Sequence, residues 1–543
     1  MVIKLSYWNK KRSFPSRNVA MNEKFKDMQR FLSLKFCPLS NFAVDKVTLK
    51  TNEMTKKLLL LCVGAMLAIC QVKAQQTPTF HEKYRPQYHF SPSKGWIGDP
   101  SGLMYYQGKY HMYWWGKAES KDLVHYQEIS NDNVMQNVDS NTACFTGSAL
   151  IDKNNTAGLG KNAFIAAMTL YFQDSKKQAQ GIAFSHDGDK FYLYDQNPVL
   201  DIWSTEFRDP TVFWCEKTQK WVMVVAKALE KKVKFYDSDD LRHWQWISDF
   251  GPSGDSEKSW ECPDLFQLPV VNDDSCSKKW VLVVSVNWAQ EQYFVGDFDG
   301  KTFRLEENHP STPLYVDKGL DYYASRTFRD YDGTLKDIVS IGWVATWDYA
   351  QQQPSQYGKG FWSVPRKLAL KKVDGHYLLI QNPVDALAKL RGPIVSAHYS
   401  LPIGVNKLKC ALPKSNVYEM DAVFDTKTSN VFGFNLCVGE GRKLVVCYDT
   451  DSHNLVIDRT HCADVEIPKF ARMAHARVLP QKDKLRMHIF VDKSSVEIFC
   501  NDGQDVFTMQ TFPSDKQVGI ETFSYKKGAQ MDLKLWPLNS VWK

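Results

Sequence analysis

The sequence lacks every cysteine pattern that would indicate a bound metal or a disulfide framework. Twelve cysteines are present, yet none forms a Cys-x-x-Cys pair or has the spacing from histidine that a structural zinc site uses. Three of them precede residue 75, which leaves nine, and an odd number leaves at least one thiol unpaired. We therefore expect no metal site, and we expect these cysteines to be mostly buried free thiols.

The sequence also lacks an excess of one sign of charge over most of its length. The net charge of +7 arises in residues 1–75, which hold 14 basic and 4 acidic residues. The rest of the chain holds 54 basic and 57 acidic residues, a net charge of −3. Nucleic acids and anionic membranes attract proteins through basic surfaces, so we expect no nucleic-acid partner.

A long hydrophobic run is missing as well, since the apolar residues 58–70 are too few to span a bilayer. They follow Lys56 and Lys57 and precede small residues that end at Ala74. This order predicts a secretory signal peptide over residues 54–74 and favours export over a buried helix. We expect a secreted or periplasmic protein that begins near Gln75, and we interpret residues 1–53 as a mistranslated or disordered leader.

Helical periodicity is absent from the middle of the chain. Short β-branched and aromatic segments recur there between polar turns, at a period of roughly 50 residues. Five copies of this four-strand unit predict a five-bladed β-propeller over residues 75–393, with an irregular β-sandwich as the alternative. Alternating strands after residue 398 predict an antiparallel β-sandwich over residues 394–543.

Three acidic residues lie one or two residues before a proline at the start of such units: Asp99, Asp209 and Glu261. The first strand of each propeller blade lines the central channel, so we expect the three carboxylates to meet near the axis. Two carboxylates are the usual equipment for cleaving a glycosidic bond. Taken singly, each acid has a plainer interpretation as a turn, a structural ion pair or a solvated strand residue.

The residues beside the three acids suggest which acid donates a proton and which acids stay ionised. Glu261 lies between Trp260 and Cys262, and this apolar flank favours it as the proton donor while the aspartates stay ionised. Arg208, beside Asp209, is expected to hold sugar hydroxyls.

Aromatic residues make up 13% of the chain, and their rings stack on sugars as well as fill cores. Trp115, next to Trp114, is interpreted as a sugar platform, with packing between blades as the alternative. Glu497 alternates with apolar residues, so we expect it at the surface rather than in the site.

These motifs, in this order, resemble glycoside hydrolase family 32, the invertases, inulinases and levanases. Residues 96–102, 208–210 and 261–262 each match a family motif, and the resemblance runs from about residue 80 to the end. It implies Asp99 as nucleophile, Asp209 as a transition-state stabiliser and Glu261 as acid/base, with no cofactor. The substrate-binding residues that it implies, with those interpreted above, are Trp96, Trp115, Phe145, Thr146, Arg208, Tyr323 and Trp343.

The sequence departs from the family pattern around the fructose pocket. Gly98 and Ser101 replace asparagines, and the segment around Trp114 is shorter. We predict an exported β-fructosidase that hydrolyses fructans or sucrose-like oligosaccharides with retention and removes single units from chain ends. The alternatives are an endo-acting levanase or inulinase, a fructosyltransferase and, outside the enzymes, a non-catalytic fructan-binding protein.

Overall fold

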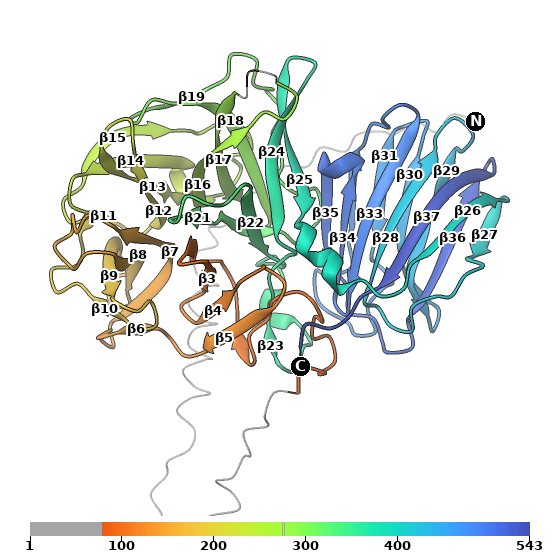
Figure 1. The fold of residues 1–543 in the computed structure, drawn as a ribbon, viewed down its shortest axis with the longest axis horizontal. Coiled ribbons are helices and arrows are strands. Elements are labelled where there is room, and N and C mark those ends of the chain that lie inside the picture. The colour runs from red at the N-terminus through yellow and green to blue at the C-terminus, as the bar shows by residue number, and fades with distance from the viewer. Residues whose placement is uncertain (1–78, 274, 276, 543) are drawn as a thin grey trace, which may run out of the picture. The chain divides into compact units, whose positions relative to one another are not determined.

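The computed structural model describes residues 79–542, except 274 and 276. The predicted leader and signal peptide lie outside the described residues. Regular structure in this part of the chain is almost entirely β, with a few short 3₁₀ helices (Figure 1). No helix among the described residues is long and apolar enough to cross a membrane.

Five sheets follow one another along residues 102–383, and each is built mainly of four strands that neighbour one another in the chain (Figure 1). The first contains β2 (Gly102–Tyr106), β3 (Lys109–Tyr113), β4 (Lys117–Ser120), β5 (Tyr126–Ser130) and the later β21 (Arg329–Asp330). The second contains β7 (Thr142–Asp152), β8 (Ala163–Phe172), β9 (Gln178–Ser185) and β10 (Phe191–Leu193), with β6 (Met135–Gln136) and β11 (Leu200–Ser204) at its margins.

The next three sheets repeat the antiparallel pattern. The third contains β12 (Phe207–Cys215), β13 (Lys220–Lys227), β14 (Lys232–Ser238) and β15 (Gln245–Phe250). The fourth contains β16 (Trp260–Pro269), β17 (Lys278–Val286), β18 (Gln290–Phe298) and β19 (Phe303–Leu305). The fifth contains β20 (Tyr323–Thr327), β22 (Ile338–Trp343), β24 (Arg366–Val373) and β25 (His376–Pro383). A separate parallel pair joins β1 (Gly95–Trp96) to β23 (Gly358–Lys359).

The first strands of the five sheets form a closed ring. β2 contacts β7, β7 contacts β12, β12 contacts β16, β16 contacts β20, and β20 returns to β2. Such a ring around an axis is the arrangement of a propeller, in which sheets stack radially and bury their faces against one another. The prediction of a propeller is therefore confirmed, and the inner ends of these strands determine where the acids lie.

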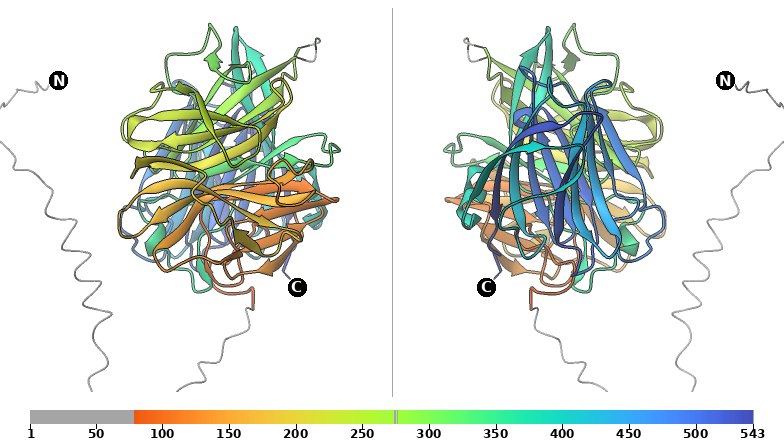
Figure 2. Two further views of the ribbon diagram at one scale, coloured as in Figure 1. Left: turned by 90° about the vertical axis from the view of Figure 1, so that its left-hand side faces the viewer. Right: turned by 90° about the vertical axis from the view of Figure 1, so that its right-hand side faces the viewer.

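Two six-stranded sheets follow the propeller and pack face to face. One has the order β26 (Val395–Leu401), β37 (Ala529–Pro537), β28 (Tyr418–Asp425), β33 (Lys484–Asp492), β34 (Ser495–Cys500), β35 (Asp505–Gln510). The other has the order β27 (Gly404–Lys407), β36 (Gly519–Tyr525), β29 (Val431–Gly439), β30 (Arg442–Asp449), β31 (Asn454–Asp458), β32 (Met473–Arg477). Apolar residues of both sheets form one core between them, which confirms the predicted β-sandwich. The right-hand view of Figure 2 looks onto these strands, drawn in blue.

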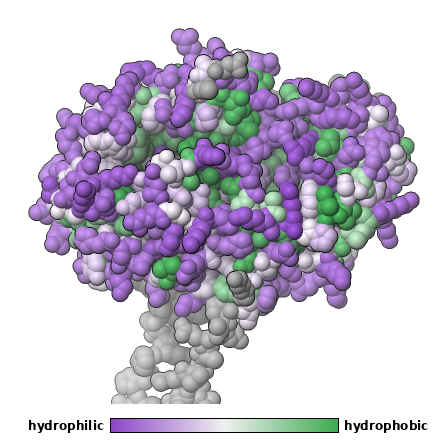
Figure 3. All heavy atoms as spheres, in the orientation of Figure 1, coloured by the Kyte–Doolittle hydropathy of each residue, from purple (hydrophilic) through white to green (hydrophobic). Residues whose placement is uncertain are grey.

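Four 3₁₀ helices complete the described elements: η1 (Ala228–Glu230), η2 (Ala350–Gln352), η3 (Asp385–Leu390) and η4 (Asn501–Gly503). The predicted domain boundary at residues 393–394 falls between η3 and β26, and it stays a prediction. On the face shown in Figure 3, polar residues prevail and hydrophobic ones form scattered patches. The eight cysteines among the described residues are free, and five of them are buried, as expected.

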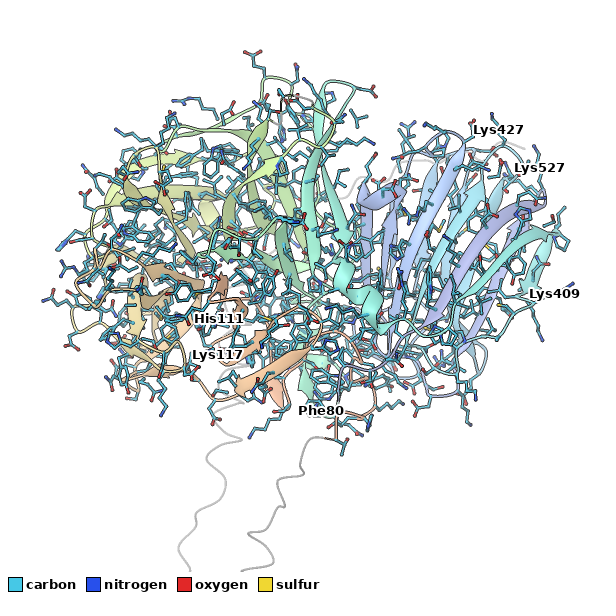
Figure 4. The ribbon with its side chains drawn as sticks, in the orientation of Figure 1. Phe80, His111, Lys117, Lys409, Lys427 and Lys527 are labelled. Carbon is cyan, nitrogen blue, oxygen red and sulfur yellow. The ribbon has the colours of Figure 1, made fainter. Side chains whose placement is uncertain are left out.

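Ion pairs join the first two sheets. Lys117 on β4 is buried, and its Nζ lies 2.9 Å from Glu119 and 2.5 Å from Asp189 near the second sheet. His111, on the paired strand β3, lies 3.4 Å from the same Glu119 (Figure 4). A buried charge is stable only with such partners, so this cluster favours one packing of the two sheets.

Candidate active site

One pocket, about 640 Å³ in volume, collects most of the residues singled out in the sequence. Asp99, Asp209 and Glu261 all line it. They come from the turn before β2, from β12 and from β16, three elements near the inner ring of strands. The ring of first strands therefore brings together three acids that are far apart in the chain.

Asp99 lies at the bottom of the pocket with one oxygen held and the other unoccupied. Thr146 Oγ1 donates a hydrogen bond of 2.7 Å to Asp99 Oδ2, and the Cys262 thiol lies 3.6 Å from that oxygen. Oδ1 is buried and accepts no hydrogen bond from any described residue. Burial raises the pKa of Asp99 to about 6, and the nearby charge of Glu261 adds to the increase.

Asp209 is aimed into the pocket by a β-bulge. The pairing of β12 with β13 shifts register after Arg208, and Asp209 has a left-handed φ of 65°. Its carboxylate Oδ2 accepts the backbone N–H of Cys262 at 3.1 Å and lies 3.5 Å from the thiol. Burial raises the pKa of Asp209, whereas the charge of Arg208 lowers it and that of Glu261 raises it further.

Glu261 has polar partners rather than the apolar surroundings expected from its flanks. Arg208 Nε and Nη2 donate to Glu261 Oε1 at 3.0 and 2.8 Å, and the Tyr323 hydroxyl donates to Oε2. The side chain of Trp260 is buried in the core between the third and fourth sheets, and Cys262 turns toward the aspartates. The expected apolar flank is absent because Trp260 points to the opposite face of the strand from Glu261, while the Cys262 thiol contacts Asp99 and Asp209.

The register of the inner strands also corrects the expected equivalence of the acids. The pairing of β16 shifts after Glu261 and that of β20 after Tyr323, as the pairing of β12 shifts after Arg208. Glu261 therefore occupies the same position in its strand as Arg208 and Tyr323 occupy in theirs, and it contacts both of them. The next residue has a left-handed backbone in all three strands: Asp209 follows Arg208, Cys262 follows Glu261, and Ala324 follows Tyr323. Asp209 and Glu261 therefore occupy adjacent positions of the repeat, not the same one.

Five of the seven predicted substrate-binding residues line the pocket: Trp96, Trp115, Phe145, Thr146 and Arg208. Tyr323 is buried and touches Glu261 from behind rather than forming wall. The expected place of Trp343 on the wall is wrong, because Trp343 is wholly buried and packs edge-on against Trp96, with ring centres 5.6 Å apart.

The pocket wall contains further residues that the motifs did not single out. Trp288 lies in the turn between β17 and β18, and Trp347 lies in the segment after β22. Trp347 donates its backbone N–H to the oxygen of Trp288 at 3.2 Å, and its ring stacks on Trp96 at 6.0 Å. Cys144, Gln178 and Glu206 complete this set. No core surrounds a tryptophan that lies in a short turn between two apolar strands. This position was the signal in the sequence that such a residue could line a binding pocket.

Gly98 shows how the site compensates for a missing side chain. A Cβ at Gly98 would lie 3.1 Å from Nε1 of Trp96, closer than most real contacts. The Trp96 indole therefore occupies the space that a residue larger than glycine would need. Trp362 Nε1 donates to the Gly98 oxygen at 2.8 Å and fixes this backbone.

Among residues 79–542, as far as they are described, no group of three or more His, Cys, Asp or Glu side chains is arranged to hold a metal ion. The arrangement is therefore one of carboxylates and a guanidinium inside an aromatic wall. Such an arrangement has the groups that a double displacement requires: carboxyls that can act as nucleophile and as proton donor, and hydrogen-bonding groups within one pocket.

Comparisons with known proteins agree with this arrangement. A model of the N-terminal domain of glycosyl hydrolases family 32 matches residues 89–383, and a model of the C-terminal part of that family matches residues 387–537. A levanase of Bacillus subtilis is 36% identical over 497 residues, which is 86% of this chain and 72% of the levanase.

Two further relatives give the same result. An extracellular exo-inulinase of Aspergillus niger is 33% identical over 515 residues, 84% of this chain and 94% of its own length. The crystal structure of exo-inulinase from Aspergillus awamori is similar with a TM-score of 0.79 at 31% identity, covering 86% of this chain and 100% of that chain. The chain therefore belongs to glycosyl hydrolases family 32 and is a glycoside hydrolase.

Proposed function

We propose that the chain hydrolyses β-fructofuranosyl linkages in fructans such as levan or inulin, and in sucrose-like oligosaccharides. The relatives named levanase and exo-inulinase support this substrate class. The observation that carries the proposal is the meeting of Asp99, Asp209 and Glu261 in one pocket with an aromatic wall. A sugar needs such a wall for its apolar face and charged groups for its hydroxyls.

In the proposed mechanism, Asp99 attacks the anomeric carbon of the fructosyl unit. An Asp99 oxygen forms a bond to that carbon while the glycosidic C–O bond breaks, and Glu261 gives its proton to the leaving oxygen. Water then attacks the same carbon, the bond from that carbon to the Asp99 oxygen breaks, and Glu261 takes the proton of that water. Two displacements at one carbon give net retention of configuration.

The contacts of the two aspartates support this division of roles. Asp99 has an oxygen without a partner among the described residues, which suits a nucleophile. The carboxylate of Asp209 is tied to the backbone N–H and thiol of Cys262, which suits a group that binds hydroxyls as charge develops. Glu261 lies between Arg208 and Tyr323, which orient it toward the leaving oxygen.

The pocket supports attack at chain ends. Its inner end lies at the ring of first strands, where Asp209 is buried, and its wall includes Trp96, Trp288 and Trp347. A closed bottom accepts a terminal unit more easily than the middle of a polymer. We infer an exo-acting enzyme, and the endo-acting alternative is an outcome of the product analysis described in the Discussion.

Export is part of the same proposal. The exo-inulinase relatives are named extracellular, and residues 54–74 have the order of a signal peptide. Sequencing the N-terminus of the protein recovered from an exporting host should show a start near Gln75. A recovered protein that still begins with Met1 would contradict export through this segment.

The activity test is direct. Purified protein should release fructose from levan, inulin or sucrose and should not act on starch or maltose, with the Asp99→Asn variant as the blank. In a water–methanol mixture a retaining enzyme should form methyl β-fructofuranoside. Failure to act on any fructoside would overturn the proposed substrate class, and an α-configured methyl product would overturn the double displacement. Longer oligosaccharides as the main product would indicate fructosyl transfer.

A further inference from the structure

Trp203 is the most exposed of the large hydrophobic side chains that the structure describes, at 84% of its full exposure. It lies on β11 where the pairing with β9 shifts register, and its backbone φ is 55°. A bulky residue rarely adopts this left-handed conformation. β-Bulges often re-aim a side chain beside an active site, so the conformation of Trp203 needs a reason that packing does not supply.

The surroundings of Trp203 hold the exposed ring in place. Its backbone N–H donates to Asp201 Oδ1 at 2.7 Å. Lys177 Nζ binds the other oxygen of Asp201 at 2.6 Å and lies 4.2 Å from the centre of the Trp203 ring. A cation over one ring face restricts the motion of the indole. The ring is thus an oriented platform, although it lies almost entirely in solvent.

Trp203 lies beside the active-site pocket. β11 runs next to β9, and Ser204 pairs with the pocket residue Gln178 (Figure 1). Glu206, three residues further along the chain, also lines the pocket. Three residues of extended chain span at most about 10 Å. The β3–β4 and β17–β18 turns contribute Trp115 and Trp288 to the pocket, and the β8–β9 turn that carries Lys177 is the corresponding turn of the second sheet.

A series of polar contacts connects Trp203 to Glu261. Glu261 contacts Arg208 at 2.8 Å, and Arg208 contacts Glu206 at 2.6 Å. The backbone N–H of Glu206 in turn donates to Ser204 Oγ at 3.0 Å, next to Trp203. Glu261 is the residue that would give a proton to the leaving oxygen. Because the leaving oxygen must lie beside Glu261, these contacts begin at the side of the pocket that holds the leaving part of the substrate.

We propose that Trp203 binds a fructosyl unit of the fructan chain beyond the bond that is cleaved, on the leaving-group side. This inference rests on the proposed function. The exposed indole face accepts the apolar face of a sugar ring, while Glu206 and Lys177 lie within reach of its hydroxyls. A substrate as short as sucrose does not extend to Trp203, so Trp203 contributes to the preference for polymers over short fructosides.

Trp246 provides a matched control in the neighbouring sheet. It is also exposed, at 56%, and lies on β15, the strand of the third sheet farthest from the ring. Lys234 lies over its ring at 5.8 Å, and its Nε1 donates to Asp249 at 2.7 Å. Trp246 thus repeats the lysine and aspartate partners of Trp203 away from the pocket.

The experiment compares kcat/KM for long-chain levan and inulin with kcat/KM for sucrose in the wild type and in the Trp203→Ala, Trp203→Phe and Trp246→Ala variants. For Trp203→Ala, the ratio of polymer to sucrose should fall about tenfold, equivalent to ~1.4 kcal/mol of binding, through a higher KM. Trp203→Phe keeps an aromatic face and should recover part of the ratio. Trp246→Ala should keep the wild-type ratio.

The other possible outcomes distinguish a failure of the role proposed for Trp203 from a failure of the proposed function. An unchanged ratio for Trp203→Ala in an active enzyme, or an equal fall for Trp246→Ala, would overturn the platform alone. A fall in kcat that is equal for sucrose and polymer would show a structural effect on the pocket and would also overturn it. A wild type that is inactive on every fructoside would overturn the proposed function and the platform together.

Discussion

Two arginines offset the acids of the pocket from different sides. Arg208 pairs with Glu261 and Glu206, whereas the buried Arg326 donates to the backbone oxygen of Asp209 at 3.3 Å. Both guanidinium groups lower the pKa of Asp209, but burial outweighs them and the pKa is raised. Asp99 and Asp209 therefore gain protons more readily than exposed aspartates do.

The roles proposed for Asp99 and Glu261 lead to different mutant behaviour. Asp99→Asn should abolish turnover of every substrate, because no other group can form the covalent intermediate. Glu261→Gln should lower kcat for sucrose by about 10²–10⁴-fold and affect an aryl fructoside with a good leaving group much less. The measurement is kcat on both substrates for both variants. Equal losses on the activated substrate would contradict the assignment.

Activity should fall as the pH decreases through about 6. Burial raises the pKa of Asp99 to about 6, and the nucleophile must be ionised, so activity is present above this pH and lost below it. The Thr146 hydrogen bond lowers the pKa of Asp99, so Thr146→Val should move the acid limb to higher pH. The check is kcat/KM on sucrose from about pH 4 to 8. An acid limb that does not respond to Thr146→Val would argue against Asp99 as its origin.

At this scale the motifs could predict which acids meet in one pocket but not what surrounds them. Asp99, Asp209 and Glu261 were visible because each lies one or two residues before a proline in a repeating unit. Trp343 and Trp347 are four residues apart, and only Trp347 reaches the pocket. The direction of each side chain depends on where β22 ends, and a one-residue uncertainty in that end reverses the direction.

Bulges in the inner strands explain how one repeat unit supplies different groups to the pocket. In β12, β16 and β20 the register shifts at equivalent positions, and one residue after each shift is left-handed. Each strand therefore presents two successive side chains near the axis instead of alternating ones. In this way Arg208 and Asp209 both line the pocket. The alternating pattern of a strand sequence does not show where a bulge interrupts the alternation.

Glu497 on β34 shows a second limit of alternation. It was expected at the surface, but it is fully buried and binds Arg366 at 2.6 Å and His89 at 2.8 Å. β34 is buried on both faces because one face packs in the sandwich core and the other carries the contact with the propeller residue Arg366. Burial lowers the pKa of His89, but bonds to Asp492 and Glu497 outweigh it and raise the pKa to about 9.

Glu497→Gln should destabilise the protein strongly. The change removes one charge from a buried network and leaves Arg366 and His89 without their shared partner. Breaking a buried pair in this way costs about 3–5 kcal/mol of unfolding free energy. Denaturant unfolding measures the loss, with Glu440→Gln as the control, because Glu440 pairs with Lys516 at the surface of the same sandwich. A loss no larger than that of the control would show that the network does not hold the two parts together.

At the scale of the whole molecule, the order of motifs carried most of the information. The recurring four-strand unit predicted the propeller, and the change of pattern after residue 398 predicted the sandwich. The short strands β6, β11, β21 and β23 were not predicted, since two to five residues give little periodicity. The partners of β6, β21 and β23 come from distant segments, as when β21 joins β2, and a local pattern does not specify such pairs.

The product pattern depends on the shape of the whole pocket. Levan and inulin digests sampled at low conversion should contain free fructose as almost the sole product. Two features of the sequence argued for an open groove: the missing side chain at Gly98 and the short segment around Trp114. In the structure, the Trp96 indole lies against Gly98, and Trp114 and Trp115 line the pocket themselves.

The wall also includes Trp288 and Trp347, whose backbones are joined by a hydrogen bond of 3.2 Å. We expect a pocket bounded in this way to accept one terminal unit and to leave the rest of the chain at the mouth. A ladder of oligosaccharides with little fructose would mean that an internal segment can enter, and the enzyme would then be endo-acting. Chromatography of the early products on both polymers distinguishes the two results, because each cleavage at a chain end releases one fructose whatever the linkage.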